Sequence, residues 1–379
     1  MNKNLLIIAG ETSGDLHGAS LIRELKKIDK ELSITGIGGN KMKAEGMELL
    51  FHISQMSFLG LIEIIKHIPY VKKVQVELIK EVKKRNIQTA VLIDYPGFNL
   101  SIAQKLKKLG VSIIYFISPQ VWAWGAGRIK KIKRLIDKML VILPFEEKLF
   151  RKNNINAEFI GHPLLEQIEN YKFLQREELF DKLKLDKTKE ILLLLPGSRL
   201  QEVIKIFPDT IYAADKLAKE LNLQIIIACS EDIDVKIFSS LTNLSGFRVI
   251  KGLTYDLYKQ SKFGIIKSGT STLEAGLFEL PMLIVYSTHP LTFYIGRKVV
   301  KIDRIGLVNI VAEDMIVPEL LQKDANPGKI YETARLILTD KVKYETIKNK
   351  LSSLKNKLGS VGASKRAAEI IYSYVVKSN

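Results

Sequence analysis

The sequence predicts an α/β fold built from two successive doubly wound parallel sheets. Short apolar runs alternate with amphipathic segments along nearly the whole chain, which is the pattern of repeated βα units. Most of the apolar runs are continuous in Leu, Ile and Val, as expected for strands that helices cover on both faces. At 379 residues the chain is also too long for one typical core, so two domains are expected.

Six apolar runs in the first half are predicted to be strands. In chain order they are LLIIAG (5–10), SITGIG (33–38), TAVLID (89–94), SIIYFIS (112–118), KMLVILP (138–144) and AEFIG (157–161). Helical segments are predicted between them at Asp15–Ile28, Tyr70–Arg85 and Ile102–Leu109. This half predicts an N-terminal Rossmann-like domain over residues 1–168.

The second half repeats this pattern after a polar stretch, 169–189, which we interpret as the connection between the domains. The predicted strands are EILLLLPGS (190–198), LQIIIACS (223–230), FRVIKG (247–252), FGIIKSG (263–269) and PMLIVYS (281–287). Helices are predicted at Lys329–Leu338, Tyr344–Lys357 and Ala363–Val376. We therefore expect a C-terminal Rossmann-like domain over 190–345, facing the first across a cleft. The helices of 346–379 are expected to pack back on the first domain, since no strand follows them.

The formal net charge of +17 attracts polyanions, which include nucleic acid, anionic lipid surfaces and phosphorylated substrates, without selecting among them. The single cysteine, Cys229, excludes an intramolecular disulfide and is expected to be a small buried residue in a reducing cytoplasm. We find no signal-peptide pattern and no apolar stretch of the ~20 residues that span a bilayer. The five histidines lack zinc-ligand spacing, and no G-x-S-x-G elbow occurs, so metal and acyl-enzyme chemistry are not expected.

Ligands of doubly wound sheets bind beyond the carboxyl ends of the strands, so the turns that follow strands are the candidate sites. The first is AGETSGDLHG (9–18), where Thr12 and Ser13 are expected to cap a helix that begins near Asp15. Backbone amides at that helix start would hold a phosphate or a sugar hydroxyl. Glu11 and Asp15 would repel a bare phosphate, so a sugar or a lipid head group suits the turn better. An ordinary capped turn is the alternative.

A second candidate is IDYPGFNL (93–100), in which Asp94 ends an apolar strand. A carboxylate at the carboxyl end of a strand, beside the partly apolar Tyr95 and Phe98, is where a general base would be placed. The alternative is that Asp94 caps the following helix. Asn99 could equally be that cap, which would leave Asp94 for other work.

Two turns of the second half have the residues of a phosphate site. In LPGSRLQEV (195–203), Gly197 and Ser198 lead into a helix that has Arg199 at its start, which together would cradle a diphosphate. No Walker lysine follows, so nucleoside triphosphate hydrolysis is disfavoured. An ordinary capped turn is again the alternative.

In KSGTSTLEAG (267–276), Gly269, Thr270 and Ser271 lie at a helix start, and Glu274 follows one turn later on the same side. Donor groups at that helix end would bind phosphate while the carboxylate accepts hydrogen bonds from a ribose diol. A helix capped by hydroxyl groups is the alternative. We therefore expect a nucleotide on the second domain and an acceptor on the first.

These motifs occur in an order that resembles the lipid-A-disaccharide synthase family over nearly the whole chain. The stretches that carry the resemblance are AGETSGDLHG, IDYPGFNL, SPQVWAWGAGRIKKI, LPFE, FIGHPL, LPGSRLQEV, SGTSTLEAG, LVNIV and VPELLQ. Each is weakly specific alone, but the ordered set is very specific.

The resemblance implies a GT-B glycosyltransferase fold and an inverting, metal-independent reaction without a cofactor. UDP-2,3-diacylglucosamine would donate its sugar to 2,3-diacylglucosamine 1-phosphate, giving the β-1,6 disaccharide of lipid A and UDP in lipopolysaccharide biosynthesis. Members of the family are peripheral membrane proteins on the cytoplasmic side of the Gram-negative inner membrane, and some are homodimers. The same location is expected here.

The resemblance also implies roles for individual residues. Asp94 is expected to be the essential acid, either as the base or as a group that orients the acceptor, and Arg199, Glu274 and Asn309 are expected around the nucleotide. From the charge that develops on the diphosphate, we also expect Arg199 to stabilise the leaving group. The chain departs from the family pattern at two positions. Gly97 stands where some members have a second acid, and Val308 stands before Asn309 where a proline is common. The second departure removes a proline that would restrict the backbone before Asn309.

Both tryptophans of the chain, Trp122 and Trp124, lie one residue apart ahead of a basic run. The basic residues of that run are Arg128, Lys130, Lys131, Lys133 and Arg134. Taken alone, the pattern fits a buried aromatic pair followed by a solvated helix face. Given the acylated, phosphorylated substrates that the resemblance implies, we interpret it as a docking or acyl-entry element at an anionic membrane surface.

Two other functions remain open from sequence. Another GT-B enzyme that uses UDP-N-acetylglucosamine, such as the 2-epimerase or a peptidoglycan glycosyltransferase, would share the nucleotide turns but needs no lipid-facing basic tract. A basic nucleic-acid-binding module would explain the charge, but it leaves the phosphate turns without a purpose and no nucleic-acid motif is present. No nucleic-acid partner is therefore expected.

Overall fold

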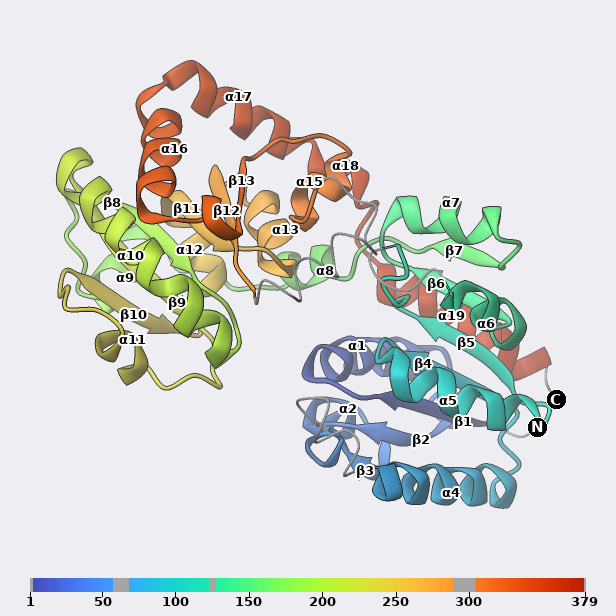
Figure 1. Cartoon of the computed structure of the whole chain (residues 1–379). Coiled ribbons are helices and arrows are strands. Elements are labelled where there is room, and N and C mark those ends of the chain that lie inside the picture. The colour runs from blue at the N-terminus through green and yellow to red at the C-terminus, as the bar shows by residue number, and fades with distance from the viewer. Residues whose placement is uncertain (1–2, 57–67, 123–126, 289–303, 378–379) are drawn as a thin grey trace. The chain divides into compact units, whose positions relative to one another are not determined.

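The computed structural model describes residues 3–56, 68–122, 127–288 and 304–377 of the chain (Figure 1). These residues form two compact units. The first unit comprises Met1–Glu166 and Leu358–Asn379, and the second comprises Gln167–Lys357. Each unit has its own parallel sheet, so the predicted α/β class with two parallel sheets is confirmed.

Within the described residues, the sheet of the first unit has seven strands in the order β3-β2-β1-β4-β5-β6-β7, and every pairing is parallel. Their bounds are β1 (Asn4–Ala9), β2 (Ser33–Gly38), β3 (Glu48–His52), β4 (Thr89–Ile93), β5 (Ser112–Phe116), β6 (Lys138–Val141) and β7 (Ala157–Phe159). Because the chain moves outward from β1 in one direction and then from β4 in the other, the strand order reverses between these two strands.

Helices cover both faces of this sheet (Figure 1). They are α1 (Thr12–Ile28), α2 (Asn40–Ala44), α4 (Ile68–Lys84), α5 (Pro96–Lys107), α6 (Arg128–Leu135), α7 (Pro144–Lys152), α8 (Leu164–Glu169, which runs into the second unit) and α19 (Ala363–Lys377), with a 3-10 turn, η1 (Ile53–Gln55). Alternate residues of β1 face the two sides: Leu6 and Ile8 join the core under α4, α5 and α6, whereas Leu5 and Ile7 join the core under α1 and α19. This burial on both faces explains the continuous apolar runs.

The sheet of the second unit has six parallel strands among the residues that the structure describes, in the order β10-β9-β8-β11-β12-β13. Their bounds are β8 (Glu190–Leu195), β9 (Leu223–Cys229), β10 (Phe247–Lys251), β11 (Ser261–Lys267), β12 (Met282–Tyr286) and β13 (Glu319–Leu321). The strand order of this sheet reverses between β8 and β11.

The helices of the second unit follow the same βα alternation. They are α9 (Arg176–Lys182), α10 (Leu200–Leu221), α11 (Lys236–Ser240), α12 (Thr254–Gln260), α13 (Thr270–Leu277), α15 (Leu307–Ala312), α16 (Pro327–Thr339), α17 (Lys341–Ser352) and α18 (Leu354–Lys357), with a 3-10 turn, η2 (Gln322–Asp324).

The boundaries between the units differ from those predicted. The polar stretch 169–189, which we interpreted as the connection between the domains, is part of the second unit and contains α9, whose Leu179 and Phe180 are buried. The tail 346–379 divides: α17 and α18 belong to the second unit, and α19 packs on α1 in the first. A helix in a polar stretch can belong to a compact unit because a few buried side chains are enough to dock it. This holds for α9 and α17 in the second unit and for α19 in the first.

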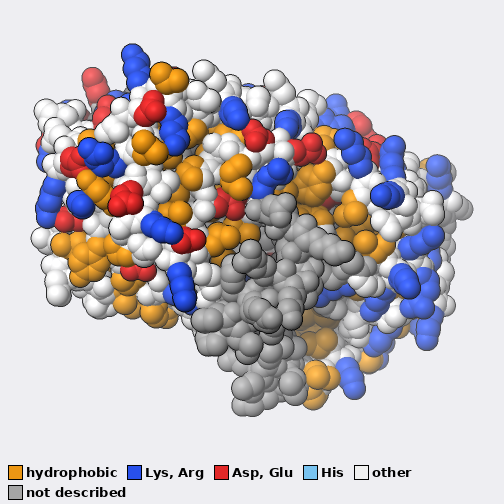
Figure 2. All heavy atoms as spheres, turned by 45° about the horizontal axis from the view of Figure 1, so that its top comes forward, with side chains coloured by type: hydrophobic (Ala, Val, Ile, Leu, Met, Phe, Trp, Pro, Cys, Tyr) orange, Lys and Arg blue, Asp and Glu red, His pale blue; other side chains and the backbone are white. Residues whose placement is uncertain are grey.

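The surface reflects the basic composition of the chain. Figure 2 shows a face on which many Lys and Arg side chains are spread among acidic and hydrophobic ones. None of the helices in the described ranges is long and apolar enough to cross a membrane.

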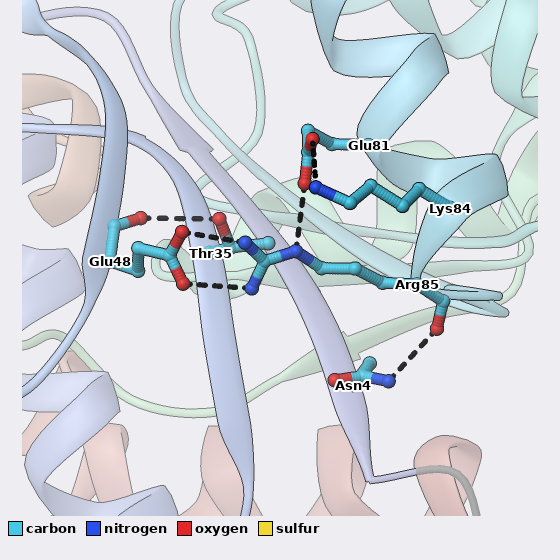
Figure 3. A network of polar contacts seen from close by, with 6 residues as sticks. All are labelled: Asn4, Thr35, Glu48, Glu81, Lys84 and Arg85. Atoms are coloured by element: carbon cyan, nitrogen blue, oxygen red, sulfur yellow. Dashed lines mark hydrogen bonds and ion pairs between the residues drawn. The ribbon is translucent and has the colours of Figure 1, made fainter.

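An ion-pair network attaches the edge strand β3 to the end of α4 (Figure 3). Arg85 follows α4, and its two terminal nitrogens donate to the two carboxylate oxygens of Glu48 at 2.8 and 2.6 Å. Its Nε donates to Glu81 at 2.8 Å, and its carbonyl accepts from Asn4 Nδ2 at 2.9 Å. Bidentate pairs of this kind combine strength with fixed geometry, so the network holds the edge strand against the helix.

Candidate functional site

A pocket of about 390 Å³ lies within the second unit, at the carboxyl ends of β8, β9 and β11. Its lining residues are Leu195, Gly197, Ser198, Ala228, Cys229, Ser230, Thr254, Tyr255, Tyr258, Lys267, Gly269, Thr270, Ser271 and Glu274. The pocket includes the point where the strand order reverses between β8 and β11, which is where doubly wound sheets bind their ligands. Both predicted phosphate turns of the second half therefore reach one pocket.

Glu202 fixes the turn that follows β8. It accepts a hydrogen bond from the backbone N–H of Ser198 at 3.2 Å, and its other oxygen pairs with Lys267 at 2.8 Å. Gly197 has φ +141°, and a Cβ there would lie 2.6 Å from Glu202, so this position requires glycine. Arg199 is the exposed N-cap residue of α10 and is not among the pocket-lining residues. The lining cation is Lys267, which sequence reasoning did not single out.

The turn after β11 presents a helix start and a buried acid to the same pocket. Gly269 precedes α13, and Thr270 and Ser271 form its first residues. One turn later, Glu274 accepts a hydrogen bond from the Tyr258 hydroxyl at 3.2 Å. Burial raises the pKa of Glu274. This carboxylate is thus a hydrogen-bond acceptor already positioned inside the pocket.

Aromatic side chains from α12 form another wall, which the sequence analysis missed. Tyr255 and Tyr258 line the pocket, and their rings stack with centroids 6.5 Å apart. Burial raises the pKa of both phenols, so both stay protonated and able to donate. The available signal was the placement of TYDLY directly after the strand FRVIKG. Cys229 also lines the pocket, and burial raises its thiol pKa.

Asn309 does not line this pocket. It lies on α15, fully buried, and its side-chain amide donates to the carbonyl of Val317 at 2.8 Å and to Glu319 at 2.8 Å. Its side-chain oxygen accepts from the backbone N–H of Val317 at 3.1 Å. Asn309 therefore ties α15 to the chain that enters β13, and its contact with a nucleotide stays a prediction.

In the first unit, Asp94 lies immediately after β4, beside the point where the strand order reverses. Asp94 and Tyr95 have φ values of 43° and 44°, a left-handed conformation that is uncommon outside glycine and asparagine. The carbonyl of Asp94 accepts hydrogen bonds from Asn99 Nδ2 at 2.7 Å and from the Tyr115 hydroxyl. The N-cap residue of α5 is Tyr95, and no side chain caps this helix. Asp94 is therefore not a helix cap, which was the alternative to its role as a base, and Asn99 is not a cap either.

The environment of Asp94 suits a proton acceptor. Burial, and then the nearby charge of Glu11, raise the pKa of Asp94 to about 6, while the backbone N–H of Tyr95 lowers it. A carboxyl group with this pKa is ionised near neutral pH yet basic enough to take a proton.

The turn after β1 packs on the turn after β4. A Cβ added at Gly10 would lie 2.1 Å from the Tyr95 ring, so only glycine allows this approach. The helix begins at Thr12 rather than near Asp15, its N-cap residue is Glu11, and no side-chain cap is formed. Glu11 and Ser13 are exposed at this edge of the sheet.

Asp15, which we predicted to lie on the acceptor side of this turn, is buried against the backbone of a neighbouring turn. It is 4% exposed, and its carboxylate accepts from the backbone N–H groups of Gly39, Lys41 and Met42 at 2.7, 3.1 and 3.0 Å. These amides lie at the start of α2, so Asp15 caps that helix from a distance. A Cβ at Gly39 would lie 2.5 Å from the same carboxylate.

Trp122, which we expected on the acceptor or lipid side, is anchored to the fold. Its half-buried indole donates to Glu146 at 3.0 Å and packs edge-on against Phe145 with ring centroids 5.3 Å apart. These contacts favour the alternative of a buried aromatic residue for Trp122 alone, and its role at a lipid surface stays a prediction. Trp124 lies outside the described residues.

The basic run is helix α6. It buries Ile132 and Leu135 and leaves most of its cations at the surface. Arg128, Lys130, Lys131, Lys133 and Arg134 form no ion pair with any residue that the structure describes. Among those residues, no group of three or more His, Cys, Asp or Glu side chains could hold a metal ion.

Comparison with known proteins identifies the family. A model of lipid-A-disaccharide synthetase matches residues 5–372. The chain is 36% identical to a lipid-A-disaccharide synthase of Myxococcus xanthus, covering 97% of this chain and 96% of that protein. It is 37% identical to the enzyme of Syntrophus aciditrophicus, covering 100% and 99% of the two chains.

Solved structures show the same fold at low identity. UDP-N-acetylglucosamine 2-epimerase from Neisseria meningitidis, bound to UDP-N-acetylglucosamine, has a TM-score of 0.68 and 12% identity, covering 98% of this chain and 100% of that one. A calicheamicin glycosyltransferase has a TM-score of 0.63 and 12% identity, covering 99% and 98%. The fold is thus that of the GT-B glycosyltransferases and epimerases, with two Rossmann-like domains. By the family match and the identity over its whole length, the chain belongs to the lipid-A-disaccharide synthases, glycosyltransferases of lipid A biosynthesis.

Proposed function

We propose that the chain transfers the sugar of UDP-2,3-diacylglucosamine to 2,3-diacylglucosamine 1-phosphate. The reaction inverts the anomeric centre, forms the β-1,6 disaccharide and releases UDP. The observation that carries the proposal is the convergence of both phosphate-type turns and Glu274 on one pocket at the strand-order reversal of the second unit. UDP-N-acetylglucosamine bound to a structural neighbour of the same fold supports a UDP-sugar as the donor.

The pocket offers a matching group for each part of UDP. The amides at the start of α13 and the ammonium group of Lys267 suit the diphosphate, since both favour negative charge. The Glu274 carboxylate suits the ribose diol, to which it can only accept hydrogen bonds. The Tyr255 ring and the end of β9 would then lie around the base. Arg199 at the rim is exposed and would reach the diphosphate as charge develops on it.

Asp94 is the proposed general base. An inverting transfer requires the 6-hydroxyl of the acceptor to lose its proton as it attacks the anomeric carbon on the side opposite UDP. A carboxylate with a pKa of about 6 can take that proton near neutral pH, and general-base catalysis contributes about 10²–10⁴-fold. Glu11, which raises the pKa of Asp94, therefore tunes the base.

We propose that the enzyme works as a peripheral protein at the cytoplasmic face of the inner membrane, with homodimerisation open to test. The basic face of α6 supports this, because each Lys or Arg near an anionic surface contributes about 1 kcal/mol. Trp122 is not part of the surface-binding element in this proposal, since its indole is held by Glu146.

The test combines a substrate assay with calorimetry. UDP release should depend on the acylated donor, should not occur with UDP-N-acetylglucosamine, and should survive EDTA. Lys267→Ala should weaken UDP binding, because it removes the cation that lines the pocket. The matched control is Lys262→Ala, at the opposite end of the same strand. Turnover with the acetylated donor would favour an epimerase-like function, and loss of turnover in EDTA that Mg²⁺ restores would refute the metal-independent reaction.

A further inference from the structure

Glu146 is a buried carboxylate to which the proposed function assigns no role. It lies in the first turn of α7 and is 2% exposed. One of its oxygens accepts from the Ser118 hydroxyl at 2.7 Å and from the Trp122 indole N–H at 3.0 Å. The other accepts from the backbone N–H of Leu143 at 3.3 Å. Both oxygens are thus occupied by donors from the turns that follow β5 and β6.

The segment 117–122, which follows β5, begins in a strained conformation. Ile117 has φ 64°, which is a genuine outlier for a β-branched residue. Its backbone N–H donates to Leu140 of β6 at 3.0 Å, which fixes the first residue of the segment to the neighbouring strand. Strain of this kind persists only where the surrounding contacts determine the conformation, and it is concentrated at functional sites.

The same segment starts beside Asp94. Phe116, the last residue of β5, pairs with Ile93 of β4, and its carbonyl accepts from the backbone N–H of Asp94 at 3.2 Å. Asp94, Tyr95 and Ile117 are therefore three left-handed residues on two adjacent strand ends. The hydrogen bond from Asp94 to Phe116 thus joins the backbone at Asp94 to the residue immediately before the segment.

Two consecutive residues of α7 hold the far end of the segment. Phe145 packs edge-on against the indole ring of Trp122, and Glu146 accepts from the indole nitrogen. Burial is the main cause that raises the pKa of Glu146 to about 7, and the charge of Asp94 adds to it. Because α7 follows β6, and β6, β5 and β4 are neighbouring parallel strands, α7 begins at the same edge of the sheet as Asp94.

We propose that Glu146 is a positioning residue for the acceptor: its carboxylate holds the segment 117–122 beside Asp94, where that segment forms one wall of the acceptor site. The inference rests on the proposed binding of the acceptor to the first unit. With Glu146 included, the residues proposed to form the acceptor site follow β5 and β6 as well as β1 and β4.

Glu146→Gln tests this role with little change in volume. A glutamine has one acceptor oxygen for the three donors, and its amide group cannot accept from Leu143. We expect the acceptor KM to rise about ten- to a hundredfold, as a displacement of about 1 Å at a binding wall would produce. The donor KM and the affinity for UDP, both properties of the second unit, should not change.

Tryptophan fluorescence reports the segment directly. In a Trp124→Phe background Trp122 is the remaining tryptophan, and acrylamide should quench it more strongly once Glu146→Gln releases the indole. The matched control is Glu147→Gln, which removes the neighbouring carboxylate, a partner of Arg151 at 2.8 Å. That control should leave both the quenching and the acceptor KM unchanged.

A folded Glu146→Gln variant with a normal acceptor KM would overturn the inference, and so would a loss of stability without a change in KM. If that variant does not fold, Ser118→Ala and Trp122→Phe each remove one donor, and a normal acceptor KM in both would overturn it equally. Normal turnover of Asp94→Asn combined with a raised acceptor KM of Glu146→Gln would refute only the base assignment. A wild-type chain that transfers nothing to the acylated acceptor would refute the proposed function, and the acceptor role of Glu146 with it.

Discussion

Replacing Asp94 by Asn should slow the enzyme and stabilise the protein at the same time. The pKa of this carboxyl rises from its ordinary value of 3.8 to about 6 in the folded protein, chiefly by burial. Each pKa unit corresponds to about 1.4 kcal/mol, so ionised Asp94 lowers the free energy of unfolding by about 3 kcal/mol at most. Asn removes this charge and also tolerates the left-handed conformation at φ 43°, which Ala would not.

The expected gain in the free energy of unfolding is about 1–3 kcal/mol above pH 6, with little gain below about pH 4. The direction follows because the folded state binds the proton more tightly than the unfolded state, so the wild-type chain loses stability as the pH rises between these values. A melting temperature higher by about 2–4 °C per kcal/mol would report it. The Asn variant should lose about 10²–10⁴-fold in turnover at saturating substrate, with UDP still bound.

The pH profile supplies an independent measurement. Wild-type turnover should fall as the pH drops through about 6, to about one-tenth near pH 5, because only about a tenth of Asp94 is then ionised. Glu11→Gln should move this acid limb to lower pH, since the Glu11 charge raises the pKa of Asp94. Near-normal turnover of Asp94→Asn, or a wild-type profile that stays flat from pH 7 to 5, would refute the assignment of Asp94 as the base.

Three further outcomes are expected. Glu274→Gln should weaken UDP binding by about tenfold, because the carboxylate proposed to accept from the ribose diol is replaced by a weaker, neutral acceptor. Calorimetry should show the same loss of affinity for UDP and for UMP, and an unchanged Kd would exclude the ribose contact. Arg85→Ala should lower the free energy of unfolding by about 1–3 kcal/mol, because its pair with Glu48 holds the edge strand β3 and its pair with Glu81 holds the end of α4. The affinity for UDP should not change, since the pocket lies in the second unit, and equal denaturant midpoints would contradict the expected loss of stability. Neutralising Lys130, Lys131 and Lys133 together should weaken the free energy of binding to anionic vesicles by about two to three kcal/mol, as measured by co-sedimentation. Wild-type binding that does not weaken with added salt would refute an electrostatic interaction.

The strands could be predicted where they are buried on both faces. The runs 5–9 and 191–195 are almost fully apolar because helices cover both sides of each sheet. The two strands that the sequence analysis missed, β3 and β13, lie at sheet edges, where their residues are half-buried or exposed and polar positions are tolerated. The short helix α9 was missed for a related reason, since only a few of its residues are buried.

The site could be predicted only as far as local sequence determines it. Gly197, Gly269 and Glu274 belong to turns directly after central strands, so fold class alone brings them to one edge. The role of Asp15 could not be predicted, because its partners Gly39 and Met42 lie 24 and 27 residues away. The same holds for Glu146, whose nearest signal was the short string LPFE and two of whose three donors, Ser118 and Trp122, come from another turn.

The return of α19 to the first unit has a consequence for biosynthesis. During translation the first 166 residues emerge well before the last 22, and the whole second unit is made in between. Until α19 arrives, the side chains on α1 and the sheet that meet Ala367, Ala368 and Ile371 remain exposed to solvent. The second unit is continuous in sequence and can complete its core before α19 is made, whereas the first unit must wait for α19. A nascent chain that stops before residue 363 should therefore be a target for chaperones and proteases through its N-terminal half, although the missing residues are at the opposite end.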